Sequence, residues 1–149
     1  TLFINDVGSG TYEEINQGVA GANYGFPNSE GYSVNAGETA PKYAYTHNSG
    51  RCAIVGGSFY NPTTAQFPSQ YVGKYFFTDY CTSQLFYIDP ANPTSQDGAP
   101  TLLTVGDIGP VDVDVASDRT MYVLTRGSAG SSGGIPTCRG TAPNSGWRR

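Results

Sequence analysis

The sequence predicts an all-β fold, most simply two or three blades of a β-propeller with long loops. The 149 residues include 20 Gly, 10 Pro and 13% aromatic side chains, a composition that favours turns and strands over helices. Three stretches, residues 2–6, 75–79 and 122–126, share an apolar, aromatic-rich run that ends in polar residues, and they start 73 and 47 residues apart. A period of roughly 40 to 50 residues with several short strands is typical of a propeller blade, and the longer interval indicates one blade with an insertion.

Further strands are expected around these three, in chain order at residues 43–47, 52–55, 84–89, 101–105 and 111–115. The last of them alternates Val with Asp, so its valines are predicted to share one face and its aspartates the other. Asp118 and Arg119 are expected to close a hairpin into the strand at 122–126. Helix is expected at most as one turn at residues 13–17. The Tyr and Phe clusters around residues 59–60 and 71–77 are interpreted as sheet core.

Charge and hydropathy exclude two classes of partner. The formal net charge is −4 and the pI is about 4.7, so there is no basic stripe to neutralise phosphates, and nucleic acid is not an expected partner. No apolar run approaches the roughly 20 residues that cross a bilayer, so no membrane span is predicted. Because the first residues already have the pattern of a strand, the chain is expected to begin inside a larger protein.

The chain changes character near residue 127. Residues 1–127 hold all 12 acidic residues and five of the eight basic ones, whereas residues 128–149 hold three arginines and no acid. We therefore divide the chain into propeller blades at 1–127 and a Gly/Ser-rich tail at 128–149 that is predicted to be disordered. The final strand of the last blade is expected to be missing.

An acidic, glycine-rich region near the N-terminus is the most informative segment for chemistry. Residues 5–16 and 21–31 combine carboxylates with backbone carbonyls that glycines allow to turn inward. Calcium prefers six to eight oxygen ligands of these two kinds. The alternative interpretation is a solvated acidic turn.

The motifs D-V-G, E-E-I-N, N-Y-G-F-P-N-S-E-G, Y-A-Y-T-H, G-G-S-F-Y and F-P-x-x-Y-x-G-x-Y-F-F-x-D-Y-C occur in this order, followed by V-D-V-x-V-x-x-D-x-x-x-Y-V-L. Together they resemble the glucose/sorbosone dehydrogenase family over about residues 1–127. The resemblance implies part of a six-bladed β-propeller, namely its C-terminal two to three blades. It also implies sugar oxidation with pyrroloquinoline quinone (PQQ) and calcium as cofactors, a sugar or other carbohydrate as partner, and a secreted or periplasmic location.

The resemblance also assigns site residues. A structural calcium would be bound by the Glu14 carboxylate and the Tyr24 carbonyl, and the carbonyls of Gly8 and Ser9 would hold the calcium of the quinone. The family's general-base histidine lies in blades that precede Thr1, and the lysine and arginines that the family offers to the quinone have no counterpart nearby. The chain alone is therefore not expected to be catalytic.

Two functions remain open from the sequence. One is a fragment of a PQQ-dependent aldose or sorbosone dehydrogenase, and the other is a calcium-stabilised carbohydrate-binding or structural module. An incomplete ring of blades leaves open edges, which are expected to be covered by self-association or by the missing N-terminal blades.

Cysteine and histidine add two expectations. The resemblance implies a Cys52–Cys81 disulfide and hence an oxidising compartment, with Cys138 left over in the tail; three free thiols are the alternative. His47 is the one histidine, which excludes every zinc site that needs two. Because it follows the run Tyr43–Thr46, it is expected to lie at the end of a strand with a structural hydrogen bond.

Overall fold

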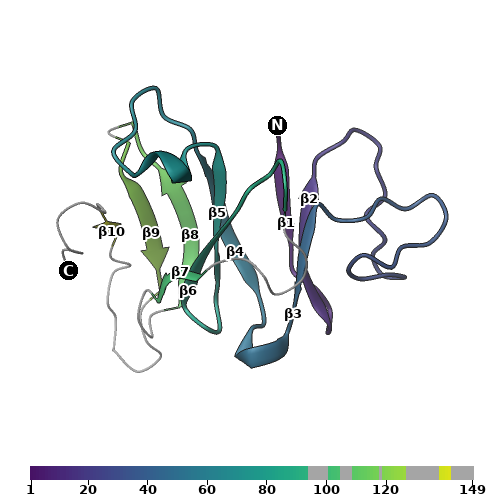
Figure 1. Cartoon of the computed structure of the whole chain (residues 1–149). Helices are drawn as coiled ribbons and strands as arrows, with labels where there is room; N and C mark the ends of the chain where they lie inside the picture. The colour runs from purple at the N-terminus through teal and green to yellow at the C-terminus, as the bar shows by residue number, and fades with distance from the viewer. Residues whose placement is uncertain (94–100, 105–108, 118, 127–137, 142–149) are drawn as a thin grey trace.

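The computed structural model describes residues 1–93, 101–104, 109–117, 119–126 and 138–141 of the chain. It contains three small antiparallel sheets that stand side by side, with long connections at both ends (Figure 1). The two helical segments among the described residues are single 3-10 turns, η1 (Asn48–Gly50) and η2 (Ser69–Tyr71). None of the described helices has the length and apolar character needed to span a membrane. The predicted all-β class is confirmed.

The sheets follow one another along the chain, and we name them by that order. The N-terminal sheet has the strand order β1-β2-β3, the middle sheet β4-β5-β6-β7 and the C-terminal sheet β10-β9-β8. The bounds are β1 Phe3–Asp6, β2 Tyr12–Gln17, β3 Tyr43–Thr46, β4 Ile54–Tyr60, β5 Lys74–Asp79, β6 Gln84–Ile88, β7 Thr101–Thr104, β8 Pro110–Val115, β9 Met121–Thr125 and β10 Cys138–Thr141.

The middle sheet is buried on both faces, which explains its continuous apolar sequence. Along β5, Tyr75 and Phe77 point toward the N-terminal sheet, whereas Phe76 points toward the C-terminal sheet. Successive side chains of a strand alternate between faces, so a strand with two buried faces reads as an unbroken aromatic run. The predicted aromatic core is confirmed, and it consists of two clusters, one in each space between sheets.

Two predicted elements need correction. Residues 13–17 form part of β2 and make no helical turn, because both faces of this strand are buried and its polar residues hide the period of two. Within β8, Val113 and Val115 pack into the core but Val111 is 38% exposed. The cause is a register shift between Pro110 and Asp112, which turns Val111 out of the row of valines.

The inner strands of neighbouring sheets lie close together. Gly56 on β4 has a φ of 61°, and a Cβ atom there would lie 2.4 Å from the Val113 nitrogen of β8. Only glycine permits this approach. The strand predicted at 52–55 corresponds to β4, which begins at Ile54 and continues through the two glycines to Tyr60, five residues beyond the predicted end.

The connection of β8 to β9 and the tail complete the fold. The Ala116 N–H donates to the Thr120 carbonyl at 3.0 Å, which forms the predicted hairpin turn, although Asp118 lies outside the described residues. Residues 138–141 form β10, which pairs with β9. The sequence predicted no strand at residues 138–141. Residues 127–137 and 142–149 lie outside the described residues, so the predicted disorder there stays a prediction.

Candidate metal and cofactor site

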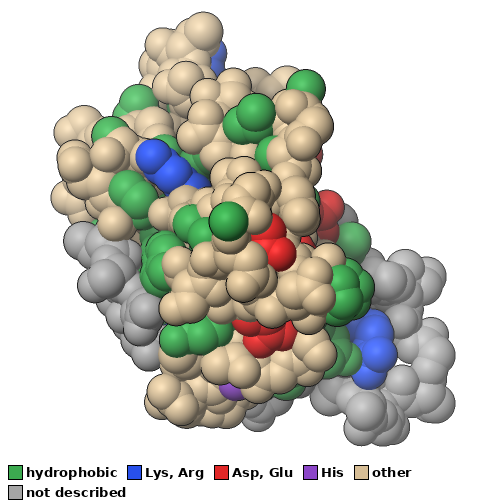
Figure 2. All heavy atoms as spheres, turned by 90° about the vertical axis from the view of Figure 1, so that its right-hand side faces the viewer, with side chains coloured by type: hydrophobic (Ala, Val, Ile, Leu, Met, Phe, Trp, Pro, Cys, Tyr) green, Lys and Arg blue, Asp and Glu red, His purple; other side chains and the backbone are tan. Residues whose placement is uncertain are grey.

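One small pocket brings together the four residues that the sequence analysis named. It lies where the turn after β1 meets β2 and the long loop of residues 18–42, and its volume is about 20 Å³. Figure 2 shows acidic side chains gathered near the middle of the face that this loop and the N-terminal sheet form. The residues lining the pocket are Asp6, Val7, Gly8, Ser9, Glu14, Tyr24, Phe26, Ser29 and Glu30.

The β1–β2 hairpin places the first part of the pocket. Asp6 at the end of β1 is the register partner of Glu14 on β2, so the ladder brings these two carboxylates to the same end of the sheet. Gly8 lies in the connecting turn, where a Cβ atom would stand 1.6 Å from the Tyr12 carbonyl oxygen. A side chain at Gly8 would force the turn open, so the turn that carries Gly8 and Ser9 depends on glycine.

Glu30, which the sequence analysis did not select, holds the turn from the opposite side. Its carboxylate accepts backbone N–H bonds from Ser9, from Gly10 at 3.1 Å, from Thr11 at 2.9 Å and from Tyr12 at 3.4 Å. Partial burial opposes ionisation, but these backbone donors outweigh it and lower the pKa of Glu30. The glutamate of the N-S-E-G motif was the available signal, and its role as an acceptor of backbone amides became visible only with the fold.

Glu14 is the buried carboxylate of the pocket. It is 5% exposed and accepts the Gly31 N–H from the long loop. Burial raises the pKa of Glu14, and the nearby Asp6 and Glu30 raise it further. Its second oxygen lies 3.4 Å from the Asn16 Nδ2, too far for a strong hydrogen bond. A positive charge near this group would therefore be favourable.

The Tyr24 side chain anchors the long loop to the sheet. Its hydroxyl donates to the Gln17 carbonyl at 2.7 Å and accepts the Val19 N–H at 2.9 Å. These bonds fix the backbone around Tyr24, whose carbonyl is the ligand that the resemblance names. Phe26, two residues on, lies in the pocket lining and is 77% exposed.

The pocket fits a calcium ion in part. Asn16 does not line the pocket but lies next to Glu14; it is fully buried, and its Oδ1 is the one buried side-chain nitrogen or oxygen of the described residues that has no hydrogen-bond partner. An orphaned oxygen beside a buried carboxylate is a reason to expect a cation or a water. The described residues contain no group of three or more acidic, His or Cys side chains placed to hold a metal. A calcium ion here would thus need backbone carbonyls in addition to Glu14.

The same pocket does not fit a quinone with three carboxylates. Its lining has Asp6, Glu14 and Glu30 but no Lys or Arg. Carboxylate groups bind where Arg or Lys can donate charge-assisted hydrogen bonds. Gly8 and Ser9 line the pocket, but the negative charge of the surrounding residues does not suit a quinone with three carboxylates.

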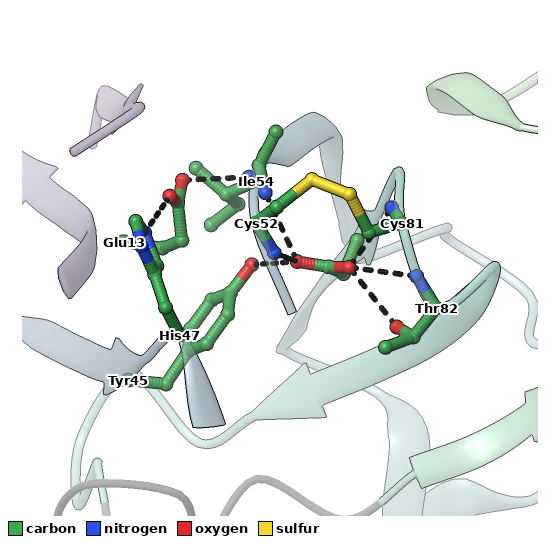
Figure 3. Close-up of a disulfide and its surroundings, with 9 residues drawn as sticks. Glu13, Tyr45, His47, Cys52, Ile54, Cys81 and Thr82 are labelled. Carbon is green, nitrogen blue, oxygen red and sulfur yellow. Dashed lines mark hydrogen bonds and ion pairs between the residues drawn. A yellow bond between two sulfur atoms is a disulfide. The ribbon is translucent and has the colours of Figure 1, made fainter. Parts of the chain in front are cut away.

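A second polar cluster lies where the N-terminal and middle sheets meet, around the disulfide (Figure 3). Cys52 and Cys81 are bonded, as the resemblance implied, with their Cα atoms 5.6 Å apart. Next to them, the fully buried Asp79 accepts six hydrogen bonds. Its Oδ2 faces the Tyr45 hydroxyl and the Cys52 and Ala53 amides, and its Oδ1 faces the Cys81 amide and both the amide and the hydroxyl of Thr82.

Glu13 and His47 belong to this cluster. The fully buried Glu13 carboxylate lies 2.6 Å from the His47 Nε2 and accepts the Ile54 N–H at 2.7 Å. Burial raises the pKa of Glu13 although both contacts oppose this. The predicted structural hydrogen bond of His47 at a strand end is confirmed, and it joins β3 through Glu13 to the start of β4. The contacts of this cluster are structural ones, because they run between sheets and do not face the pocket.

Comparison with known proteins identifies the fold. No family model and no curated protein matches the sequence. Solved structures do match: the PQQ-bound aldose sugar dehydrogenase of Streptomyces coelicolor has a TM-score of 0.65 and 21% identity over 91% of this chain. The soluble aldose sugar dehydrogenase of Escherichia coli, in its apo form, has a TM-score of 0.62 and 24% identity over 83%, and a glucose dehydrogenase has 0.63 and 18% over 84%.

The chain thus has the fold of part of these sugar dehydrogenases, and it spans about 38% of the length of each. The resemblance found in the sequence is confirmed at the level of the fold. With these comparisons the three sheets are blades of a partial β-propeller. The described sheets carry three, four and three strands.

Proposed function

We propose that the chain forms the C-terminal blades of a larger propeller of the soluble sugar dehydrogenase type. It would act in the quinone-dependent oxidation of an aldose or related sugar together with blades supplied from outside residues 1–149. The observation that supports this most is the structural match over 83% to 91% of this chain but 38% of each relative. The chain alone is not catalytic in this proposal, because the general base belongs to the other blades.

Calcium is the cofactor that this chain itself would hold. The Glu14 carboxylate and the Tyr24 carbonyl would be ligands, and the ion would neutralise the buried charge of Glu14 and tie the long loop to β2. A ligand that binds only the native state raises its stability by mass action. PQQ would bind only with cationic groups from other blades, since the pocket has none of its own.

The calcium part is tested by calorimetry and thermal unfolding of the full chain. We expect calcium to bind and to raise the Tm, and Glu14→Gln to abolish both effects. Glu38→Gln is the matched control, because Glu38 is another carboxylate of the same loop, bonded to the Ser29 hydroxyl and the Asn35 amide and absent from the pocket lining. A Tm that is the same with calcium and with chelator would contradict the assignment.

The enzymatic part is tested by a chimera. This chain would replace the matched 38% of the E. coli aldose sugar dehydrogenase, and dye reduction would be measured with PQQ, calcium and an aldose. We expect turnover by the chimera and none by this chain alone. A chimera that folds, binds calcium and shows no turnover would contradict the proposal.

One observation favours a second candidate, a calcium-stabilised carbohydrate-binding or structural module. The pocket lacks cations for a quinone, but the 77% exposed ring of Phe26 stands in its lining. An aromatic face beside a few polar groups is typical of small-molecule sites. Sugar binding without dye reduction by the chimera would support this module.

Location follows from the same proposal. The Cys52–Cys81 disulfide is typical of oxidising compartments, so we infer a secreted or periplasmic protein. Expression with and without an export signal, followed by thiol labelling, would test this.

A further inference from the structure

A second and larger pocket, which we call the Arg119 pocket, lies at the other end of the sheets. Its volume is about 390 Å³, and it stands between the connection of β4 to β5 and the turn of β8 to β9. In Figure 1 both of these segments lie at the top of their sheets, whereas β1 runs downward from the N label to the turn that carries Gly8. The two pockets share no lining residue. Pockets of roughly 300 Å³ or more can enclose a small organic molecule.

The β4–β5 connection forms an ordered wall of the Arg119 pocket. Tyr60 ends β4 and is fully buried, and its hydroxyl accepts the Gln66 and Phe67 amides at 2.8 and 2.9 Å. The Tyr60 ring also stacks on the Phe67 ring, with centroids 4.6 Å apart, and the Tyr60 carbonyl accepts the Gly73 N–H at 2.7 Å. These contacts fold the connection back on the end of β4, so residues 61–63, which line the pocket, are held in place without a ligand. Such pre-organisation lowers the entropic cost of binding.

Arg119 supplies the charge of the pocket, because the described lining contains no other Lys or Arg and no Asp or Glu. The backbone of Arg119 has a φ of 70°, a left-handed conformation that turns usually give to Gly or Asn, and its N–H donates to the Ala116 carbonyl at 2.8 Å. The side chain is half-buried and has no ion-pair partner among the described residues. Strained residues are typical of ligand-binding sites, and a guanidinium without a counter-charge favours an anionic ligand.

The remaining lining groups indicate which anion fits. A guanidinium forms a bidentate pair with one carboxylate, and the net charge of −4 disfavours polyanions. The Ser58 hydroxyl lies 3.4 Å from the Asp114 carboxylate, a weak contact that a ligand could replace. Hydroxyl and amide groups able to bond to ligand hydroxyls come from Ser58, Asn61, Thr63 and Ser117.

We propose that the Arg119 pocket binds a small monocarboxylate that carries several hydroxyl groups. The Arg119 guanidinium would pair with the carboxylate, and the polar side chains of the two walls would bond to the hydroxyls. This site goes beyond the proposed function and does not depend on it, because it shares no residue with the pocket around Glu14.

NMR titration of the full chain with gluconate tests the site. The buffer contains a chelator, since hydroxy acids also bind calcium. Sorbitol is the control ligand, because it has the hydroxyl groups and no carboxylate. We expect gluconate to shift the amide signals of Asn61, Thr63 and Arg119 and to leave those of Gly8 and Ser9 in place, whereas sorbitol should shift none of them.

Substitutions of arginine separate the charge from the fold. Arg119→Gly removes the guanidinium and suits a φ of 70°, so the Tm should not fall, but the Kd for gluconate should rise about tenfold or more. Arg119→Lys keeps the charge without the bidentate geometry, so its Kd should lie between these two. Arg126→Gln is the matched control, because Arg126 lies over the Tyr80 ring and outside the pocket lining, and its Kd should equal that of the original chain.

Three results would overturn the proposal: no response to gluconate, equal affinity of Arg119→Gly and the original chain, or shifts at Gly8 and Ser9 in place of the Arg119 pocket. Tighter binding of inorganic phosphate than of gluconate would overturn the assigned class of ligand. Because every sample lacks calcium and PQQ, none of these results bears on the calcium or chimera experiments, and the two proposals fail separately.

Discussion

Asp79 provides the sharpest test of what joins the N-terminal and middle sheets. It is fully buried, and its two carboxylate oxygens accept six hydrogen bonds at 2.9 to 3.3 Å. In Asp79→Asn one oxygen becomes an NH2 group, which must then face at least two backbone N–H donors. Each buried donor left unsatisfied costs about 1 to 3 kcal/mol. We therefore expect a loss of about 3 kcal/mol in the free energy of unfolding.

The assay is equilibrium unfolding in urea under oxidising conditions, with Asp114→Asn as the control. Asp114 is an exposed aspartate on β8, and its substitution should change the free energy of unfolding by less than about 0.5 kcal/mol. A second background without the Cys52–Cys81 disulfide separates the two links. The disulfide closes a sequence separation of 29 residues, which corresponds to about 3.5 kcal/mol in the chain-entropy model.

Because Asp79 and the disulfide both tie the Cys52 segment to the turn after β5, their effects should not be additive. We expect Asp79→Asn to cost less when the two cysteines are replaced by alanine, since the Cys52 and Ala53 amides can then move away and reach water. An Asp79→Asn variant as stable as the original chain would refute the reasoning. Such a result would mean that the six bonds contribute no more than bonds to water.

Three further predictions concern the pocket. Glu30→Gln should make the free energy of unfolding depend less on pH in acid. Because the pKa of Glu30 is lowered in the folded chain, its stabilisation is present above its ordinary pKa of 4.5 and is lost as the pH falls through the lower folded pKa. An unchanged slope in acid titrations would contradict this. Phe26→Ala should leave the Tm within about 1 °C, because the ring is exposed, but should weaken any sugar binding measured by calorimetry. Asn16→Leu should raise the free energy of unfolding of the calcium-free chain by about 1 kcal/mol, because it removes a buried oxygen without a hydrogen-bond partner. It should also reduce the rise in Tm on adding calcium. A lower stability of the calcium-free chain would show that Asn16 has a partner there.

Much of the fold could be predicted because the middle sheet repeats a simple pattern. The aromatic run at residues 75–79 and the matching stretches at 2–6 and 122–126 located one strand in each sheet, namely β5, β1 and β9. What failed was β2, whose polar residues are buried on both faces. Glu13 is covered by His47 and β4, and Glu14 by the loop that carries Gly31. No local period reveals such a strand, because its burial comes from segments more than 15 residues away.

The candidate site, too, could be predicted only in part from the sequence. Gly8, Ser9, Glu14 and Tyr24 were selected through the motifs and do line one pocket. Glu30 was missed, since a single glutamate in a polar loop has the pattern of a solvated charge. Its contacts with four successive amides arise from the way the loop folds back on the β1–β2 turn, which requires the tertiary structure.

The alignment of the sheets also shows how the core of the N-terminal sheet differs from that of the middle sheet. The registers place Asp6 opposite Glu14 and Asp79 opposite Gln84, so Asn16 on β2 corresponds to Phe86 on β6. Phe86 belongs to the apolar core between sheets, whereas Asn16 is fully buried with its Nδ2 3.4 Å from the Glu14 carboxylate. At corresponding positions, the middle sheet therefore carries the Phe86 ring and the N-terminal sheet the Asn16 amide. A buried polar group in such a place costs stability unless it is hydrogen-bonded, and the Asn16 Oδ1 has no partner among the described residues.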